Sequence, residues 1–156
     1  MTNQSKLMSV DPERELYIER VLRAPRELVW KVCTEPAHLV KWWGPDGFTN
    51  TVSVMDVRVG GKWNLTMHGP DGTDYPNEKV YRVVEKPGKL VFDHVSAPHH
   101  TTTITLEDLG KETRLCWHML FESKEEFEMV VKTYKADEGL AQNIEKLERY
   151  FTMIND

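Results

Sequence analysis

Residues 123–156 at the C-terminus read SKEEFEMVVKTYKADEGLAQNIEKLERYFTMIND. Apolar residues recur there at steps of three and four, the period of a helix with one apolar face. Ser123 and Glu126 have the spacing of a capping box, so Ser123 is expected to accept a hydrogen bond from one free amide while Glu126 reaches back to another. The segment Asp137-Glu138-Gly139 interrupts the stripe, and glycine is unfavourable inside a helix. We therefore predict a short helix, a bend, and a long main helix from about Gly139.

The rest of the chain is expected to form the surface on which this helix lies. Alternation with a period of two predicts a strand over residues 16–22 and further strands from Thr51 onward. Two short helical patterns lie between Pro25 and Gly44-Pro45, and the second carries Trp42 and Trp43. Six of the seven predicted strands are consecutive and joined by short turns, which favours an antiparallel meander. The predicted fold is α+β, with a curved seven-stranded antiparallel sheet wrapped around the long C-terminal helix.

Length and composition restrict the class of protein. The 156 residues suffice for one domain, predicted over residues 13–156 after a flexible tail over residues 1–12. The net charge of -5 argues against nucleic-acid binding, which relies on clustered lysine and arginine. Because the chain has neither a secretory signal pattern nor a run of about 20 apolar residues, we expect a soluble cytoplasmic protein without a membrane span. Cys33 and Cys116 lack any paired spacing and are expected to be reduced thiols.

The predicted inner face of the sheet mixes aromatic rings with methionines, unlike an ordinary aliphatic core. Such a lining can adapt to apolar guests of different shape, so we expect a ligand cavity between the sheet and the C-terminal helix. The residues predicted to line this cavity are Arg20, Trp43, Met55, Trp63, Leu65, Met67, Tyr81, Phe92, His94, Trp117, Met119, Tyr134, Leu140 and Ile144.

Four short motifs in a fixed order resemble a known family. They are RVLRAPRELVW at 20–30, LVKWWGP at 39–45, DVRVGGKW at 56–63, and EGL at 138–140 followed by Leu147. Together they resemble the START-like superfamily with the helix-grip fold, within the group similar to the C-terminal domain of the Aha-type activator of the ninety-kilodalton heat-shock-protein ATPase. The resemblance implies a deep cavity for lipids, polyketides and other apolar molecules, used in some relatives for cyclase or hydrolase chemistry. The chain departs from the family pattern at Asn77-Glu78-Lys79 and at His94, both near the expected cavity.

Two polar residues in apolar positions have alternative interpretations. Arg20 lies in the apolar register of its strand and needs a partner, because an unpaired buried charge is costly. A structural ion pair with Asp56 or Glu19 is favoured over recognition of an anion in the cavity. His94 follows Leu90 and Phe92 on the inward face, where it either contacts a ligand, as a hydrogen-bond partner or general base, or is a satisfied core histidine.

No metal, cofactor or catalytic group is predicted from the residue pattern. His99 and His100 are adjacent in a strand-like segment, so their side chains should point to opposite faces and bind one ion poorly. The sequence shows no accompanying cluster of Cys, Asp or Glu that would complete a metal site. It also shows neither a Ser-His-Asp order nor paired carboxylates.

Three hypotheses for function follow. The first is non-enzymatic binding of a hydrophobic, lipid- or polyketide-like small molecule in the cavity. The second, suggested by the resemblance, is a chaperone-associated module that activates an ATPase. The third is a cyclase- or hydrolase-type enzyme that uses His94 with Arg20 or Tyr81 to polarise a carbonyl. For all three, a monomer or a homodimer is expected.

Overall fold

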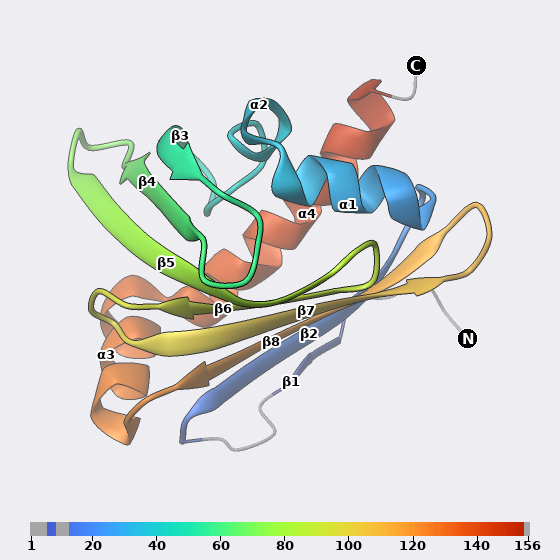
Figure 1. The fold of residues 1–156 in the computed structure, drawn as a ribbon. Helices are drawn as coiled ribbons and strands as arrows, with labels where there is room; N and C mark the ends of the chain where they lie inside the picture. The colour runs from blue at the N-terminus through green and yellow to red at the C-terminus, as the bar shows by residue number, and fades with distance from the viewer. Residues whose placement is uncertain (1–5, 9–12, 155–156) are drawn as a thin grey trace.

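The computed structural model describes residues 6–8 and 13–154 and confirms the predicted order of elements (Figure 1). A strand is followed by two short helices, six strands and the C-terminal helices. The elements are β1 Lys6–Met8, β2 Glu15–Leu22, α1 Arg26–Thr34, α2 Pro36–Leu39, β3 Thr49–Met55, β4 Lys62–His68, β5 Asp74–Glu85, β6 Lys89–His94, β7 His100–Asp108, β8 Thr113–Phe121, α3 Lys124–Tyr134 and α4 Ala136–Ile154.

The strands form one antiparallel sheet in the order β1-β2-β8-β7-β6-β5-β4-β3. Strands β3 to β8 pair in chain order, which confirms the predicted meander, and β2 then pairs with β8. The sheet contains the seven predicted strands and one more, β1, which pairs with β2. β1 lies within the predicted flexible tail, and its main-chain pairing with β2 extends the sheet at that edge. The rest of the predicted tail, residues 1–5 and 9–12, lies outside the described residues.

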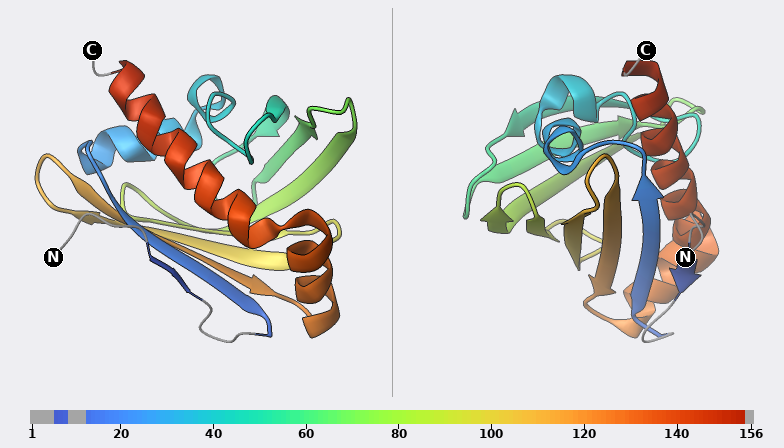
Figure 2. Two further views of the ribbon diagram at one scale, coloured as in Figure 1. Left: turned by 180° about the vertical axis from the view of Figure 1, so that it is seen from behind. Right: turned by 90° about the vertical axis from the view of Figure 1, so that its right-hand side faces the viewer.

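The C-terminal helix α4 crosses the concave face of the sheet, with α3 at one end of it (Figure 2). Most of the predicted apolar stripe of α4 is buried, including Leu140, Ile144, Leu147 and Phe151, whereas Ile154 at its end is exposed. The strands curve around this helix, and the register shifts between Val52 and Val54 and between Tyr81 and Val83 contribute local bends. The sheet and α4 therefore enclose a common interior, as the helix-grip prediction requires. Among the described residues, no helix is long and apolar enough to cross a membrane.

The bend between the two C-terminal helices lies at Lys135, and the predicted position near Gly139 is wrong. Lys135 has a φ of 54° and ends α3 in the left-handed conformation, with its N–H donating to the Val130 carbonyl. Gly139 lies inside α4, where a Cβ atom would come within 3.4 Å of the Pro45 ring. That distance is an ordinary van der Waals contact, so the glycine is an interior residue of α4 and does not mark the bend.

Two further predictions about helix ends need correction. Ser123 Oγ accepts from the Glu126 N–H at 3.1 Å, but the Glu126 carboxylate contacts His99 instead of completing the capping box. The second short helix, α2, ends at Leu39, so Trp42 lies in the turn that follows it and Trp43 in the loop after that turn. Trp42 is anchored there because its Nε1–H donates to the Val32 carbonyl of α1 at 3.0 Å.

Candidate functional site

A cavity of about 740 Å³ lies between the inner face of the sheet, the two C-terminal helices and the loop after α2. Eight of the predicted site residues line it: Trp43, Met67, Phe92, His94, Trp117, Met119, Tyr134 and Leu140. Most of these side chains are apolar. The cavity volume lies within the range of small-molecule sites, about 300–1,000 Å³.

The other six predicted residues do not line this cavity. Four of them, Trp63, Leu65, Tyr81 and Ile144, are buried within the core, and Met55 is partly buried against it. The Trp63 and Phe92 ring centroids are 5.1 Å apart in an edge-to-face arrangement. These side chains are covered by neighbouring core residues and pack behind the residues that line the cavity.

Arg20, the sixth residue, forms a structural ion pair, but with a partner that was not predicted. Its Nη1 donates to Glu148 Oε1 on α4 at 2.8 Å. Asp56 instead pairs with Arg58 in the hairpin loop, and Glu19 lies beside Arg114. The predicted partners are wrong because α4 crosses the inner face beside β2 and brings a carboxylate that is distant in sequence.

One row of residues across the inner face contains Lys79, which was not among the predicted lining residues, although its segment was expected near the cavity. In the strand register Lys79 is paired with Trp63 of β4 on one side and with His94 of β6 on the other. The row continues from His94 to His100 of β7 and Phe121 of β8. Because directly paired residues share one face of a sheet, the row brings a lysine and two histidines together beneath α3 and α4.

Lys79 is a buried cation held mainly by aromatic rings. The residue is only 2% exposed, and its Nζ lies 4.5 Å from the Trp63 ring centroid and 5.3 Å from that of Trp43. Nζ also donates to Asn77 Oδ1 at 3.3 Å. Burial lowers the pKa of Lys79 to about 7, since removal from water disfavours the ammonium form. Ring contacts favour the cation and offset part of this cost.

His94 lines the cavity, and both of its ring nitrogens already have protein neighbours. Nδ1 lies 2.7 Å from the Ser96 carbonyl oxygen, and Nε2 lies 2.9 Å from Asn77 Oδ1. Both neighbours are acceptors, so the ring can donate to both only as an imidazolium. Burial, reinforced by the charge of Lys79, lowers the pKa of His94 to about 4. The ring is therefore neutral near pH 7 and is a weak general base.

His100 extends the same polar row and stacks on His94, with ring centroids 4.8 Å apart. Burial, with a further contribution from His94, lowers the pKa of His100 to about 3. Near neutral pH the buried part of the lining therefore has one group, Lys79, that can carry positive charge, since its pKa is about 7.

Asn143 on α4 joins the helix to the loop that forms one wall of the cavity. Its Oδ1 accepts from the Gly44 N–H at 3.1 Å, and its Nδ2 donates to the Trp42 carbonyl at 3.0 Å. The residue is buried, as is Trp43 between these two backbone groups. Asn143 therefore fixes the position of Trp43, whose ring lies against Trp63 and Trp117.

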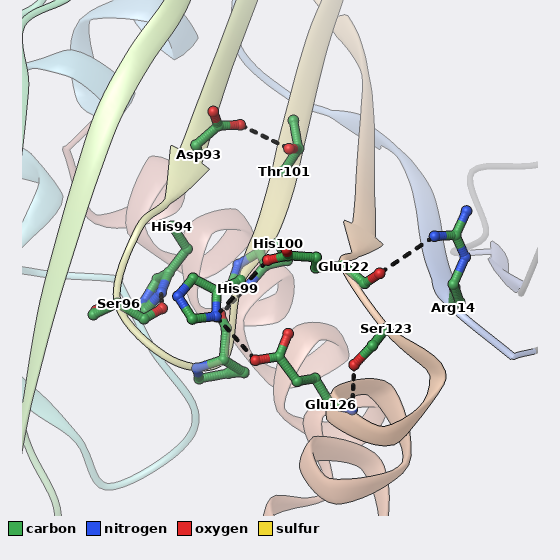
Figure 3. Close-up of polar contacts among 11 residues, drawn as sticks. Arg14, Asp93, His94, Ser96, His99, His100, Thr101, Glu122, Ser123 and Glu126 are labelled. Carbon is green, nitrogen blue, oxygen red and sulfur yellow. Dashed lines mark hydrogen bonds and ion pairs between the residues drawn. The ribbon is translucent and has the colours of Figure 1, made fainter.

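His99 does not line this cavity and lies in the loop between β6 and β7 (Figure 3). Its Nδ1 is 3.0 Å from Glu126 Oε1 and 3.9 Å from Glu122 Oε2, whereas His100 bonds the Pro98 carbonyl oxygen. The prediction that the adjacent histidines diverge is confirmed. The expectation that no carboxylates accompany them is wrong, because Glu122 and Glu126 follow β8 and reach His99 through the fold. The ion pairs of His99 with Glu122 and Glu126 explain why these three side chains lie together, and the group is open to solvent.

A curved antiparallel sheet that holds a C-terminal helix over a largely apolar cavity defines the START-like, helix-grip class of proteins. Within that class, the chain belongs to the family described as "Activator of Hsp90 ATPase homolog 1-like protein", whose model matches residues 23–152.

Solved structures of similar fold come from several bacteria. A protein of Arthrobacter aurescens is 26% identical, with a TM-score of 0.88 over 95% of this chain and 91% of that one. Protein Ms6760 of Mycobacterium smegmatis is 23% identical, with a TM-score of 0.83 over 96% and 98% of the two chains. The AHSA1 protein of Silicibacter pomeroyi is 19% identical, with a TM-score of 0.74 over 89% and 98%. No curated protein sequence matches the chain.

Proposed function

We propose that this protein binds a hydrophobic small molecule, lipid- or polyketide-like, in the cavity between the sheet and the C-terminal helices. The cavity of about 740 Å³ is the observation that carries the proposal. Its walls include Phe92, Trp117, Met119 and Leu140, which provide a large apolar contact surface. Burying such surface stabilises a complex by about 25 cal/mol per Å² before the costs of association.

The proposed role is binding without catalysis. The suggested catalytic partners of His94, Arg20 and Tyr81, do not line the cavity. The carboxylates in its described lining, Asp74 and Glu138, are exposed at the rim. The buried titratable groups of the described lining are Lys79, His94 and His100, and no buried carboxylate accompanies them there. Because His94 and His100 are weak bases, this set does not supply the matched acid and base that general acid–base chemistry requires.

The test uses two substitutions on one strand. Thr102 on β7 is buried and lines the cavity, whereas Thr103 lies on the opposite face. Thr102→Phe should fill part of the cavity and weaken binding of an apolar fluorescent probe by about tenfold or more, with little change from Thr103→Phe. Binding is measured by probe fluorescence and by quenching of the five tryptophans. Equal affinity in both folded variants, or no binding by the wild type, would contradict the proposal.

A second candidate function is a chaperone-associated role, which the description of the family favours. Its test is co-purification with a heat-shock ATPase and stimulation of that ATPase by the purified protein. No stimulation at high concentration would remove this candidate. For either role we propose a cytoplasmic protein that acts as a monomer or a homodimer.

A further inference from the structure

Lys79 is a buried ammonium group with no carboxylate partner among the described residues. Its polar contact is with the neutral Asn77, and its other close neighbours are the indoles of Trp43 and Trp63. Buried charges in proteins are normally paired, because an uncompensated charge away from water costs several kcal/mol. The side chain nevertheless lines a cavity large enough for a ligand.

We propose that the ligand carries a carboxylate and that Lys79 binds this group inside the cavity. The inference rests on the proposed binding function and specifies the chemistry of its ligand. The ligand is then an amphipathic carboxylic acid, with its charged group at the Lys79 end and its apolar part along Phe92, Met119 and Leu140.

Two features of the cavity lining fit an incoming acceptor. Trp117 lines the same cavity, and its buried indole Nε1–H has no hydrogen-bond partner within the described chain. Asn77 Oδ1 already accepts a hydrogen bond from Lys79 Nζ and lies beside Nε2 of His94. An ammonium group has three donors, so a ligand oxygen can take one that the protein leaves unused.

A carboxylate fits this site better than a phosphate. The described lining contains no arginine, and its second lysine, Lys135, is exposed at the rim. Phosphate sites usually combine several donors and more than one positive charge, often with bidentate arginine. A single buried lysine matches the single negative charge of a carboxylate.

Binding of a carboxylate would also remove the cost of burying Lys79. In the empty cavity, desolvation lowers the pKa of this lysine to about 7. An anion within about 4–6 Å stabilises the ammonium form and raises its pKa again. Ligand binding and protonation of Lys79 are therefore linked.

The test compares matched acids and alcohols. Dodecanoic acid is paired with 1-dodecanol, and 2-naphthoic acid with 2-naphthalenemethanol, so that each pair differs in charge but little in apolar shape. Affinities are measured by tryptophan quenching and calorimetry at about pH 6.5 on the wild type, Lys79→Met and Lys79→Gln. Lys62→Met, on the neighbouring strand β4, is the control because Lys62 is exposed.

The wild type and Lys62→Met should bind at least one acid about tenfold or more tightly than its alcohol, and both Lys79 variants should lose this preference while still binding the alcohol. A preference that persists in folded Lys79 variants, or equal affinity of the wild type for acid and alcohol, would overturn the carboxylate inference and leave the binding function intact. If the wild type binds none of the four compounds, the proposed function fails as well.

Discussion

Arg20 on β2 and Glu148 on α4 form an ion pair between the sheet and the C-terminal helix, with 2.8 Å between Nη1 and Oε1. The arginine side chain is 9% exposed and the glutamate side chain 37% exposed. The pair therefore places a nearly buried cation against a carboxylate that remains partly in water. It stabilises the position of α4 relative to β2, away from the lining of the cavity.

Glu148→Gln should lower the free energy of unfolding by about 1–2 kcal/mol, because Arg20 would lose its charged partner. Complete burial of both groups would give a larger loss, but solvent around Glu148 screens the pair. The measurement is urea denaturation followed by tryptophan fluorescence. Ligand affinity should not change, since neither residue lines the cavity.

The double variant Arg20→Met, Glu148→Leu provides the control for this prediction. Replacing both charges with apolar groups should cost less than the sum of the two single substitutions, because neither charge is left unpaired. Additive losses would mean that the two side chains do not interact energetically.

Lys79→Met should stabilise the empty protein at pH 7. Burial shifts the pKa of Lys79 from its usual 10.5 to about 7, so the folded state disfavours a proton that the unfolded state retains. We expect the free energy of unfolding at pH 7 to rise by about 2–4 kcal/mol, with the indole contacts of Lys79 limiting the gain.

The pH dependence of stability gives a sharper form of this prediction. Between pH 7 and 10.5 the unfolded chain binds more protons at Lys79 than the folded chain does, so wild-type stability should increase with pH across this window. The advantage of Lys79→Met should therefore shrink as pH rises. Urea denaturation at several pH values measures the difference in free energy of unfolding between the wild type and Lys79→Met, and Lys62→Met is the exposed control. A constant difference between wild type and Lys79→Met would contradict the prediction.

Affinity for a carboxylic acid should fall as pH rises through about 7, because binding then requires Lys79 to take up a proton. We expect a loss of about tenfold or more between about pH 6 and about pH 9 for the acids that bind at the lower pH. Other titratable groups face Lys79 or line the same cavity. They are His94 on β6, His100 on β7, Asp74 and Tyr75 on β5, Tyr134 on α3, Lys135 after α3 and Glu138 on α4.

The matched alcohols separate Lys79 from those other groups. His94 and His100 have pKa values lowered to about 4 and about 3, so they remain neutral over the same range. A titration at the rim that altered the cavity as a whole would also change alcohol affinity. Calorimetry on both compounds at each pH measures the difference, and a parallel loss for acid and alcohol would contradict the role of Lys79.

The fold could be predicted because the sequence patterns that mark its strands and helices are local. Alternation with a period of two located the strands, and the three- and four-residue spacing of apolar side chains located α4. The bend could not be placed, because Lys135 adopts a left-handed conformation that usually requires glycine, while the nearby Gly139 lies inside α4.

The site could be predicted only in part for a related reason. The aromatic and methionine lining follows from which strand positions face inward, but the partner of Arg20 lies on α4, far away in sequence. Lys79 had an available signal, since it lies two residues before Tyr81 and so on the same strand face. Its position beside His94 depends on the pairing of β5 with β6, which the alternation of one strand does not determine.

Asn143→Leu should destabilise the protein by about 2–4 kcal/mol, because two buried backbone groups would lose their hydrogen-bond partner. These groups are the Gly44 N–H and the Trp42 carbonyl, at 3.1 Å and 3.0 Å from the Asn143 amide. Released from α4, Trp43 should change its environment, so its fluorescence and the affinity for apolar probes should change together. Thermal and urea denaturation measure the stability.

Gln142→Leu, at the adjacent position of α4, is the matched control. Gln142 Oε1 accepts from the Asp46 N–H at 3.1 Å, but this hydrogen bond is exposed and water can replace it. The loss should therefore stay below about 1 kcal/mol. Equal destabilisation by the two substitutions would show that the buried amide does not hold the loop. A loss of stability in Asn143→Leu without any change in probe affinity would show that the loop position does not shape the cavity.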